Sequence, residues 1–477
     1  MNAWVSAWIP RLTTHTLAIV VSLLTYVLTT RVERERRPPS IAIAWVLGLI
    51  AIPYLVLPLY LLFGRRKLSR KALPPGGSKA LGRHWAEDLI MSFGLSASAP
   101  SHLRLHGDGA ASLAALFETF AAARARLDIC TYILGKDPIG REIVDGLIAR
   151  VRAGVRVRLL IDGVGAIQLP KRLFRRLHAA GIETAVFSPL LARSTSGPRN
   201  LRNHRKYVIA DEATLWAGGR NLAAEYFIGI EGEPAWVDLT FDLQGPVAAA
   251  AAAQFEADWI ASHGKPAAPI AVAGVTPIAQ RSAARGAARE PAASAGLHEA
   301  SRVQFLPSGP DQAEDTVQAV LVDACYRAEQ RIVAVTPYFV PDAGLNLAFR
   351  LAARRGVKID LCLPAASNHI LADFARSRAL RALAGTGAAI HLLPYMTHAK
   401  GIVFDDSLAV CGSANLDSRS LLLNYESAFV VYGTREIAWL AAWIRALIAD
   451  SVPFDGHPPT LIRDVAEGVL LTVAYQL

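Results

Sequence analysis

The chain contains few cysteines, and none of them is close to another. Its four cysteines, Cys130, Cys325, Cys362 and Cys411, are scattered over 477 residues. A C-x-x-C metal site and a disulfide framework both need closely or regularly spaced cysteines, so neither is indicated. Three of the four lie in apolar, strand-like runs. We expect all four to be buried as small hydrophobic residues.

The sequence also lacks charge over a long segment near its start. Residues 41–63 include no Asp, Glu, Lys or Arg, and a helix of this length reaches about 34 Å, enough for a hydrocarbon core of about 30 Å. Residues 12–30 are similarly apolar apart from His15 and several threonines. A cleaved signal peptide is the competing interpretation, but four arginines end this stretch without a small-residue cleavage signal. We therefore expect two retained transmembrane helices, at about 12–30 and 41–63.

The charge of the chain is positive, with 50 Lys and Arg against 40 Asp and Glu and a formal net charge of +10. Basic residues next to membrane segments favour anionic lipid headgroups as partners, whereas a nucleic acid is the alternative. Two membrane helices would leave both ends of the chain on one side. Arginines between the helices nearly balance the basic tract at 65–71, so the positive-inside rule favours a cytoplasmic catalytic region only slightly.

One pattern of expected elements occurs twice after residue 72. The first copy predicts a strand at 127–132, a helix at 139–152 and a strand at 155–161, and the second predicts a strand at 331–335, a helix at 345–355 and a strand at 357–363. This order indicates a parallel sheet covered by helices. We therefore predict an α/β protein with two duplicated α/β/α domains and pseudo-twofold symmetry. The expected parts are a transmembrane hairpin at 1–72, domains at 73–263 and 299–477, and an Ala/Pro/Gly-rich linker at 264–298 between them.

The same polar residues recur near the end of each half. The first copy comprises His204, Lys206, Asp211, Gly218 and Asn221, and the second comprises His398, Lys400, Asp405, Gly412 and Asn415. In both copies the offsets from histidine are 2, 7, 14 and 17, and the two histidines are 194 residues apart. So many matched positions indicate a duplicated functional site.

These residue types suit phosphoryl transfer. Histidine and lysine two positions apart in an extended segment point to the same face. Imidazole is a nucleophile and a proton carrier near neutral pH, and the lysine charge and asparagine amide stabilise phosphate oxygens. Two copies facing each other let one imidazole attack phosphorus while the other protonates the leaving alcohol and then deprotonates the incoming one. We expect no metal or other cofactor. Because Asp211 and Asp405 close their strands, we expect them to support the motif structurally and not to contact phosphate.

At these residues the chain resembles the phospholipase D superfamily, whose signature is a duplicated HxKxxxxD motif followed by G[GS]xN. Within that superfamily it is similar to the bacterial cardiolipin synthases, through RNHRK at 202–206 and GSANLDSRS at 412–420. The similarity extends from the membrane hairpin to about Val431. It implies a multi-pass enzyme of the bacterial inner (cytoplasmic) membrane that joins two phosphatidylglycerols into cardiolipin and releases glycerol. Phosphatidylethanolamine as the donor and the oligomeric state stay open.

The resemblance also assigns roles that the nearly symmetric sequence does not. It implies that His204 is the nucleophile and His398 the acid and base. It further implies that Glu426 orients the histidine of the second half and Asp238 that of the first. Ser413 occupies the position held by Gly219 in the first copy, so only the second half offers a hydroxyl. The residues expected to bind the substrate phosphate are Asn221, Ser413 and Asn415.

Three alternative functions stay open at this point. A phospholipase D hydrolase uses the same motif, because only the hydroxyl that resolves the intermediate differs, and it would release phosphatidic acid. A membrane-tethered nuclease of the same superfamily would use the basic charge for a nucleic-acid backbone, but the chain lacks basic runs interleaved with aromatic residues that stack on bases. A non-catalytic scaffold is the third, and the two intact motif copies argue against it.

Overall fold

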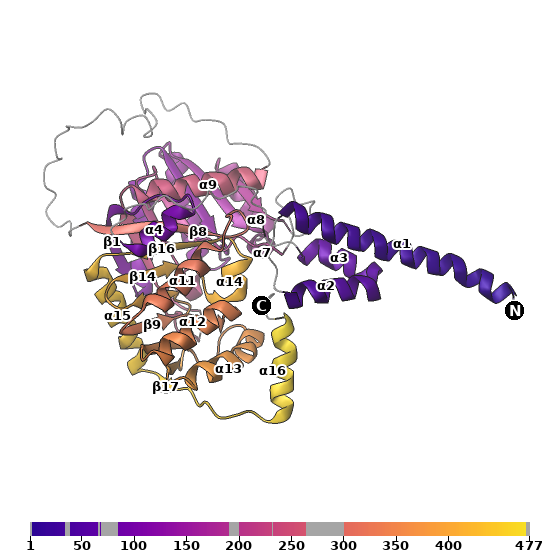
Figure 1. The fold of residues 1–477 in the computed structure, drawn as a ribbon. Helices are drawn as coiled ribbons and strands as arrows, with labels where there is room; N and C mark the ends of the chain where they lie inside the picture. Colours follow the sequence, from indigo (N-terminus) through magenta and orange to yellow (C-terminus); the bar gives the residue numbers. More distant parts are fainter. Residues whose placement is uncertain are drawn as a thin grey trace, which may run out of the picture.

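The computed structural model describes residues 2–33, 39–64, 67, 84–189, 200–230, 232–263 and 300–473. Figure 1 shows a body that contains the strands and, projecting from it, the three N-terminal helices. The linker predicted at 264–298 lies outside the described residues, as does most of the tract between the helices and the body.

The N-terminal helices differ from the expected pair. They are α1 (Asn2–Glu33), α2 (Pro39–Ala51) and α3 (Pro53–Phe63). The prediction of one continuous helix over 41–63 is wrong, because the backbone leaves the helical conformation at Ile52, with φ −141° and ψ 65°. Pro53 follows, and a proline disfavours the helical conformation of the residue before it. No helix in the described part of the chain combines the length and hydropathy needed to cross a membrane.

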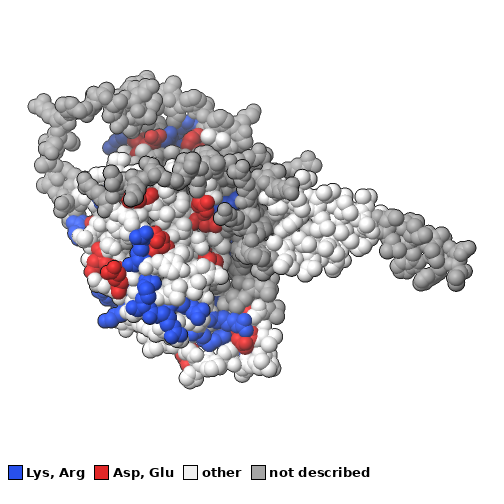
Figure 2. All heavy atoms as spheres, viewed as in Figure 1, with Lys and Arg blue, Asp and Glu red and all other residues white. Residues whose placement is uncertain are grey.

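The three helices pack around one buried tyrosine. Tyr60 of α3 is fully buried, and its hydroxyl lies 2.6 Å from Thr29 Oγ1 of α1. The rings of Tyr26 and Trp45 lie 5.3 Å and 5.2 Å from the Tyr60 ring. α2 and α3 therefore lie side by side along α1 (Figure 1). Their outer surfaces expose large apolar side chains, namely Leu17, Val20, Val21, Leu24, Val27, Leu28, Ile43, Leu47, Ile50, Tyr54, Leu55, Leu59, Leu61 and Leu62. In Figure 2 the described atoms of this projecting part show no charged side chain.

The described strands of the body form a single mixed sheet of 15 strands together with a separate pair. The strands of the first half are β1 (Ala99–His106), β2 (Arg126–Thr131), β3 (Arg156–Asp162), β4 (Glu183–Phe187), β5 (Tyr207–Ala210), β6 (Thr214–Gly218) and β7 (Thr240–Gln244). Those of the second half are β8 (Ser301–Ser308), β9 (Arg331–Val335), β11 (Lys358–Pro364), β12 (Ala389–Leu393), β13 (Gly401–Phe404), β14 (Leu408–Gly412), β16 (Glu426–Val431) and β17 (Val452–Pro453). The separate pair is β10 (Phe339–Val340) with β15 (Leu416–Asp417).

The strand order shows the duplication. One half runs β4-β3-β2-β5-β6-β7-β1 and the other β12-β11-β9-β13-β14-β16-β8, with β17 added at its edge. The predicted strand–helix–strand units are confirmed, because β2 pairs parallel to β3 and β9 pairs parallel to β11. The expectation of a parallel sheet is only partly right. β4 and β12 also pair parallel, but the other strands of each half pair antiparallel, from β5 to β7 in the first half and from β13 to β16 in the second. The halves join through the antiparallel pairing of β1 with β8.

Equivalent helices in the two halves begin and end in the same way. Asp137 caps α6 (Pro138–Arg152) and Asp342 caps α12 (Ala343–Arg354), each accepting a hydrogen bond from a backbone N–H in the first turn. Such a cap satisfies donors that have no partner within the helix. Gly154 and Gly356 follow the two helices with φ of +86° and +92°. Only glycine adopts this left-handed conformation without strain, so each helix ends there.

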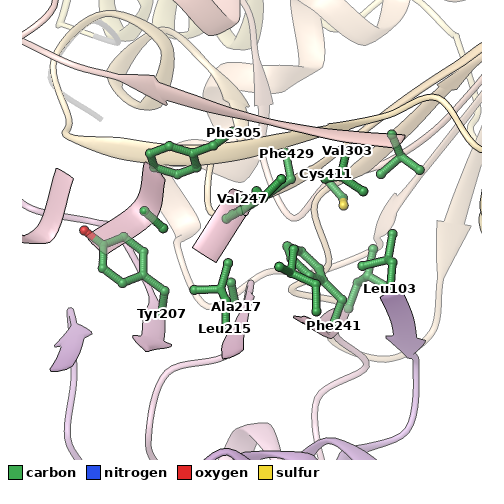
Figure 3. Packing of buried hydrophobic residues seen from close by; sticks show 14 of the residues in the cluster. Leu103, Tyr207, Leu215, Ala217, Phe241, Val247, Val303, Phe305, Cys411 and Phe429 are labelled. Carbon is green, nitrogen blue, oxygen red and sulfur yellow. The ribbon is translucent and has the colours of Figure 1, made fainter. Parts of the chain in front are cut away.

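The strands of the two halves also face each other across a shared core. Figure 3 shows Leu215, Ala217 and Phe241 on one side of this core and Cys411 and Phe429 on the other. The rings of Phe241 and Phe429 lie 4.8 Å apart in an edge-to-face arrangement. All four cysteines are buried and free, as expected. The outer faces are covered by α5 (Gly109–Ala122) and α6 in the first half and by α11 (Thr316–Arg327), α12 and α13 (Ile370–Ala384) in the second.

Candidate active site

The two motif histidines lie where the halves meet. His204 and Lys206 precede β5, and His398 and Lys400 precede β13. The backbone N–H of His204 donates to the carbonyl of Tyr425 at 2.9 Å, and that of His398 donates to Val237 at 2.7 Å. Each motif segment is therefore hydrogen-bonded to the half that does not contain it. This exchange fixes the two imidazoles relative to each other.

The carboxylates that orient the histidines are exchanged in the same way. His204 Nδ1 lies 2.9 Å and 3.1 Å from the two oxygens of Glu426, and His398 Nδ1 lies 2.8 Å from Asp238 Oδ2. The assignment of each carboxylate to the histidine of its own half is wrong. The backbone hydrogen bonds across the two halves explain this. Tyr425, which accepts from the His204 N–H, directly precedes Glu426 in the chain. In the same way Val237, which accepts from the His398 N–H, directly precedes Asp238. Donation from Nδ1 to a carboxylate leaves Nε2 as the nucleophilic nitrogen of a neutral imidazole.

Burial sets the protonation of the two motif histidines and the two motif lysines. It is the largest cause that lowers the pKa of His204 to about 4 and that of His398 to about 3. It also lowers the pKa of Lys206 to about 8 and that of Lys400 to about 7, because an ammonium loses hydration there. Both imidazoles are thus neutral near pH 7, which is the form a nucleophile needs.

The two carboxylates keep their negative charge in this setting. Burial acts to raise the pKa of Glu426, but His204 and Lys206 outweigh it and hold the pKa below its usual range. His398 and Lys400 likewise outweigh burial and hold the pKa of Asp238 below its usual range. Lys206 Nζ donates to the carbonyl of His204 at 2.9 Å. Lys400 Nζ lies 2.7 Å from His398 Nδ1 and 2.9 Å from its Nε2. Positive charge therefore surrounds the two imidazoles without replacing their carboxylate partners.

A cavity of about 190 Å³ opens onto this centre. Both histidines, Asn221 and Asn415 line it, as expected for residues that contact a substrate. Asn221 Nδ2 donates to the hydroxyl of Tyr226 at 2.7 Å, and its oxygen accepts from the backbone N–H of Ile133 at 3.3 Å. These contacts fix the amide at the wall of the cavity.

Ser413 does not lie in that wall. Its side chain is fully buried, and its hydroxyl donates to Glu426 Oε2 while accepting from the backbone N–H of Ser427 at 2.9 Å. The expectation that this hydroxyl binds the substrate phosphate is therefore corrected: Ser413 holds the carboxylate behind His204. At Gly219, the equivalent position, an added Cβ would lie 2.1 Å from Asp238 Oδ1, so the first copy has no room for a serine.

Asp211 and Asp405 lie away from the cavity, at the far ends of β5 and β13. Asp211 accepts hydrogen bonds from three consecutive backbone N–H groups, those of residues 124–126, at 2.6–2.9 Å. Asp405 accepts from the N–H groups of residues 329–331 at 2.8–3.0 Å. Both have a positive φ, 52° and 50°. They connect each motif strand to the start of the strand beside it.

Several cavity residues were not predicted from the sequence. Tyr132 and Tyr338 follow the equivalent strands β2 and β9, and the Tyr132 ring lies 5.2 Å from that of His204. The repeat itself carried this signal, because both tyrosines follow matched strands. His369 also lines the cavity. The other unpredicted lining residues include Arg202, Tyr226, Asn368, Arg419 and Asn424.

The described residues contain no group of three or more histidine, cysteine, aspartate or glutamate side chains placed to hold a metal ion. The side chains that line the cavity include two imidazoles and the amides of Asn221 and Asn415. The buried side chains of Lys206 and Lys400 adjoin the histidines without lining the cavity.

Comparison with known proteins gives this geometry a family. A family described as "Cardiolipin synthase, PLD-like domain" matches residues 116–259 and 321–448, and one described as "Phospholipase_D-nuclease N-terminal" matches residues 17–65. Cardiolipin synthase A of Pseudomonas aeruginosa is 30% identical over 448 residues, which cover 88% of this chain and 87% of that protein. The major cardiolipin synthase ClsA of Bacillus subtilis is 31% identical over 430 residues, covering 84% of this chain and 85% of that protein.

A solved structure shares the fold at low sequence identity. The phosphatidylserine synthase of Haemophilus influenzae superimposes with a TM-score of 0.60 at 16% identity, covering 83% of this chain and all of that one. The matched family segments contain both motif histidines and both of their carboxylate partners. The chain belongs to the cardiolipin synthase family of phospholipase D-like proteins.

Proposed function

We propose that this protein is a phosphatidyltransferase that makes cardiolipin from two phosphatidylglycerol molecules and releases glycerol. The observation that carries the proposal is the pair of neutral imidazoles, each held by a carboxylate of the opposite half, in one cavity. Family membership and the identity to cardiolipin synthases over most of the chain support the choice of lipid substrates. Phosphatidylethanolamine is the alternative donor.

In the first step His204 Nε2 attacks the phosphorus of the donor lipid. A P–N bond forms and the P–O bond to the headgroup glycerol breaks, giving a phosphohistidine. The leaving oxygen takes a proton from His398, whose Nδ1 is held by Asp238. The empty site favours neutral His398, but the bound phosphodiester brings a negative charge beside it and raises the pKa of this imidazole. Lys206, Lys400 and the two asparagine amides stabilise the charge on the phosphoryl oxygens.

In the second step His398 acts as the base. It accepts the proton of a glycerol hydroxyl on the second phosphatidylglycerol, and that oxygen attacks phosphorus. The P–N bond breaks, His204 is regenerated as neutral imidazole, and the product contains two phosphatidyl groups on one glycerol. His398 ends protonated, ready to protonate the next leaving group.

We further propose that α1, α2 and α3 attach the protein to the inner membrane of a bacterium, with the catalytic region on the cytoplasmic side. The support is the set of exposed apolar side chains on these helices, which would otherwise be in contact with water. Lys67, just beyond α3, fastens this part to the body: its Nζ lies 2.9 Å from Asp315 and donates to the carbonyl of Gly309 at 2.9 Å. The test is extraction by alkaline carbonate, which should leave the full chain in the membrane and release a chain that starts after residue 72.

The enzymatic proposal is tested by product analysis. Purified full-length protein in detergent is incubated with phosphatidylglycerol alone and then with phosphatidylethanolamine added, and the lipids are identified by mass spectrometry. We expect cardiolipin from the wild type, no cardiolipin from His398→Ala, and wild-type yield from His457→Ala. His457 is a matched control because its side chain is 88% exposed and it does not line the cavity.

The outcomes separate the candidate functions. Cardiolipin that forms faster when phosphatidylethanolamine is added would identify that lipid as the donor. Phosphatidic acid without cardiolipin would show that water resolves the intermediate and that the protein is a hydrolase. Full activity of His398→Ala would exclude the mechanism altogether.

A further inference from the structure

The last described helix docks on the body through its charged side. This helix, α16 (Leu461–Val473), packs against α13, and ion pairs connect the two helices. Asp464 lies 2.8 Å from the guanidinium of Arg378. Glu467, whose side chain is fully buried, pairs with Arg381. The acidic side of α16 is therefore the side that faces the protein.

The apolar side of α16 faces outward. Leu461, Ile462 and Val465 are 79%, 83% and 58% exposed. At about 3.6 residues per turn, these three side chains lie on one side of the helix, away from Asp464 and Glu467. A surface helix normally buries its apolar stripe against the core and exposes its polar side. Because α16 does the reverse, its exposed side fits an apolar partner.

A second set of exposed apolar side chains lies at the start of α13. Ile370 and Leu371 are 82% and 55% exposed. They directly follow His369, which lines the cavity that contains the two motif histidines. Phe374, one turn after Ile370 on α13, has its ring centre 5.9 Å from the guanidinium of Arg463 on α16. The α13–α16 pair therefore exposes apolar side chains both beside the cavity and along the last helix.

The cavity is too small to hold a whole phospholipid. Drug-sized ligands occupy pockets of about 300–1,000 Å³, whereas this cavity measures about 190 Å³. The acyl chains of a lipid whose phosphorus reaches His204 must therefore stay outside the cavity. Contact between acyl chains and water is unfavourable. A bilayer surface beside the cavity would keep the chains in hydrocarbon while the headgroup enters.

The position of α16 favours a bilayer over a second protein as the partner. Figure 1 shows α16 on the side of the body from which α1, α2 and α3 project. We propose that an apolar edge inserts into the bilayer surface and holds the cavity against the lipid headgroups. This inference rests on the proposed function. An amphipathic helix lying in the interface with its apolar side toward the acyl chains is a common form of such contact. The apolar edge consists of Ile370, Leu371, Leu461, Ile462 and Val465.

The test places a fluorescent label on α16 of the full-length protein. All four native cysteines are buried, so Ile462→Cys provides one reactive thiol for an NBD label. The labelled protein is reconstituted into vesicles of phosphatidylglycerol and phosphatidylethanolamine. We expect blue-shifted emission that is quenched by lipids with a nitroxide on the acyl chain near the headgroup. His457→Cys is the matched control, because His457 is 88% exposed in the loop before α16, and its label should emit as in water.

A second measurement connects the apolar edge to turnover. We expect Ile462→Ser to lower the rate on phosphatidylglycerol vesicles about tenfold, because one apolar side chain less is buried in the bilayer. The rate on a short-chain phosphatidylglycerol dissolved as monomers should not change. An equal loss on both substrates would show that α16 supports the catalytic fold, and it would overturn the proposal.

The emission at position 462 gives the other outcomes. Water-like emission there would overturn the proposal. A blue shift without quenching by the lipid nitroxide would mean that a second protein surface covers the apolar edge, and it would overturn the proposal as well. A wild type that makes no cardiolipin from either substrate rejects the proposed function, while the emission still decides the membrane contact independently.

Discussion

The exchange of carboxylates between the halves predicts which substitution blocks which step. Replacing Glu426 by glutamine removes the negative charge that accepts from His204 Nδ1 at 2.9 Å and 3.1 Å. A hydrogen bond to a charged group contributes about 1.5–3 kcal/mol, which corresponds to about 10- to 100-fold in rate. Ser413 adds to the loss, because its hydroxyl also donates to this carboxylate. In Glu426→Gln the Ser413 hydroxyl donates to the amide oxygen, so the amide nitrogen faces His204 Nδ1. The amide then favours the tautomer with its proton on Nε2, which cannot attack phosphorus. Such a change of tautomer can lower the rate about 10⁴-fold.

The assay uses a phosphatidyl donor with 4-nitrophenol as the leaving group, since this phenolate leaves without a general acid. The burst of nitrophenolate then reports the formation of the phosphohistidine alone. We expect Glu426→Gln to slow the burst at least about 10-fold, the lower end of the range that the hydrogen-bond energies give. Asp238→Asn acts through His398, so we expect it to lower the rate much less with this donor than with phosphatidylglycerol. The reverse pattern would refute the assignment and make His398 the nucleophile.

Three further predictions concern pH, the motif turns and the core. The kcat/KM of the free enzyme should fall on the alkaline side between about pH 7 and 8, where Lys400 and Lys206 lose their charge. It should fall on the acid side near about pH 4, where His204 gains a proton. A profile that stays flat well above neutral pH would contradict this. Asp405→Ala removes the acceptor for three backbone N–H groups and leaves alanine at a φ of 50°. It should lower the free energy of unfolding by about 2–4 kcal/mol and lower the Tm in thermal unfolding. The control is Asp406→Ala at the exposed neighbouring position, which should leave the Tm nearly unaltered. Phe429→Ala opens a cavity between the two halves and should cost about 3–5 kcal/mol in denaturant unfolding; an unaltered midpoint would show that this contact is not part of the core.

The repeat made the fold and much of the site predictable. The order strand, helix, strand occurs in both halves, and Gly154 and Gly356 mark the ends of the two helices. This pattern predicted the parallel units because helix caps and hydrophobic periodicity act locally. The matched His and Lys pairs identified the centre for the same reason. The site they predict, two imidazoles in one cavity, is where the structure places His204 and His398.

The remaining features depend on contacts between distant segments. Which carboxylate faces which histidine is decided by the hydrogen bonds of Tyr425 and Val237 across the two halves, and no local pattern encodes that pairing. Ser413 was misjudged for a related reason: a buried carboxylate competes for its hydroxyl. The break at Ile52 was missed because an apolar run looks the same whether or not its proline interrupts the helix.

The exchanged pairing has a consequence for the protein before it is complete. Glu426 is synthesised more than 200 residues after His204, so this histidine has no orienting partner while the chain is still emerging from the ribosome. A fragment that ends in the first half would likewise carry Asp238 without the imidazole it serves. Both orienting contacts therefore exist only when the two halves have folded together, and an incomplete chain lacks them.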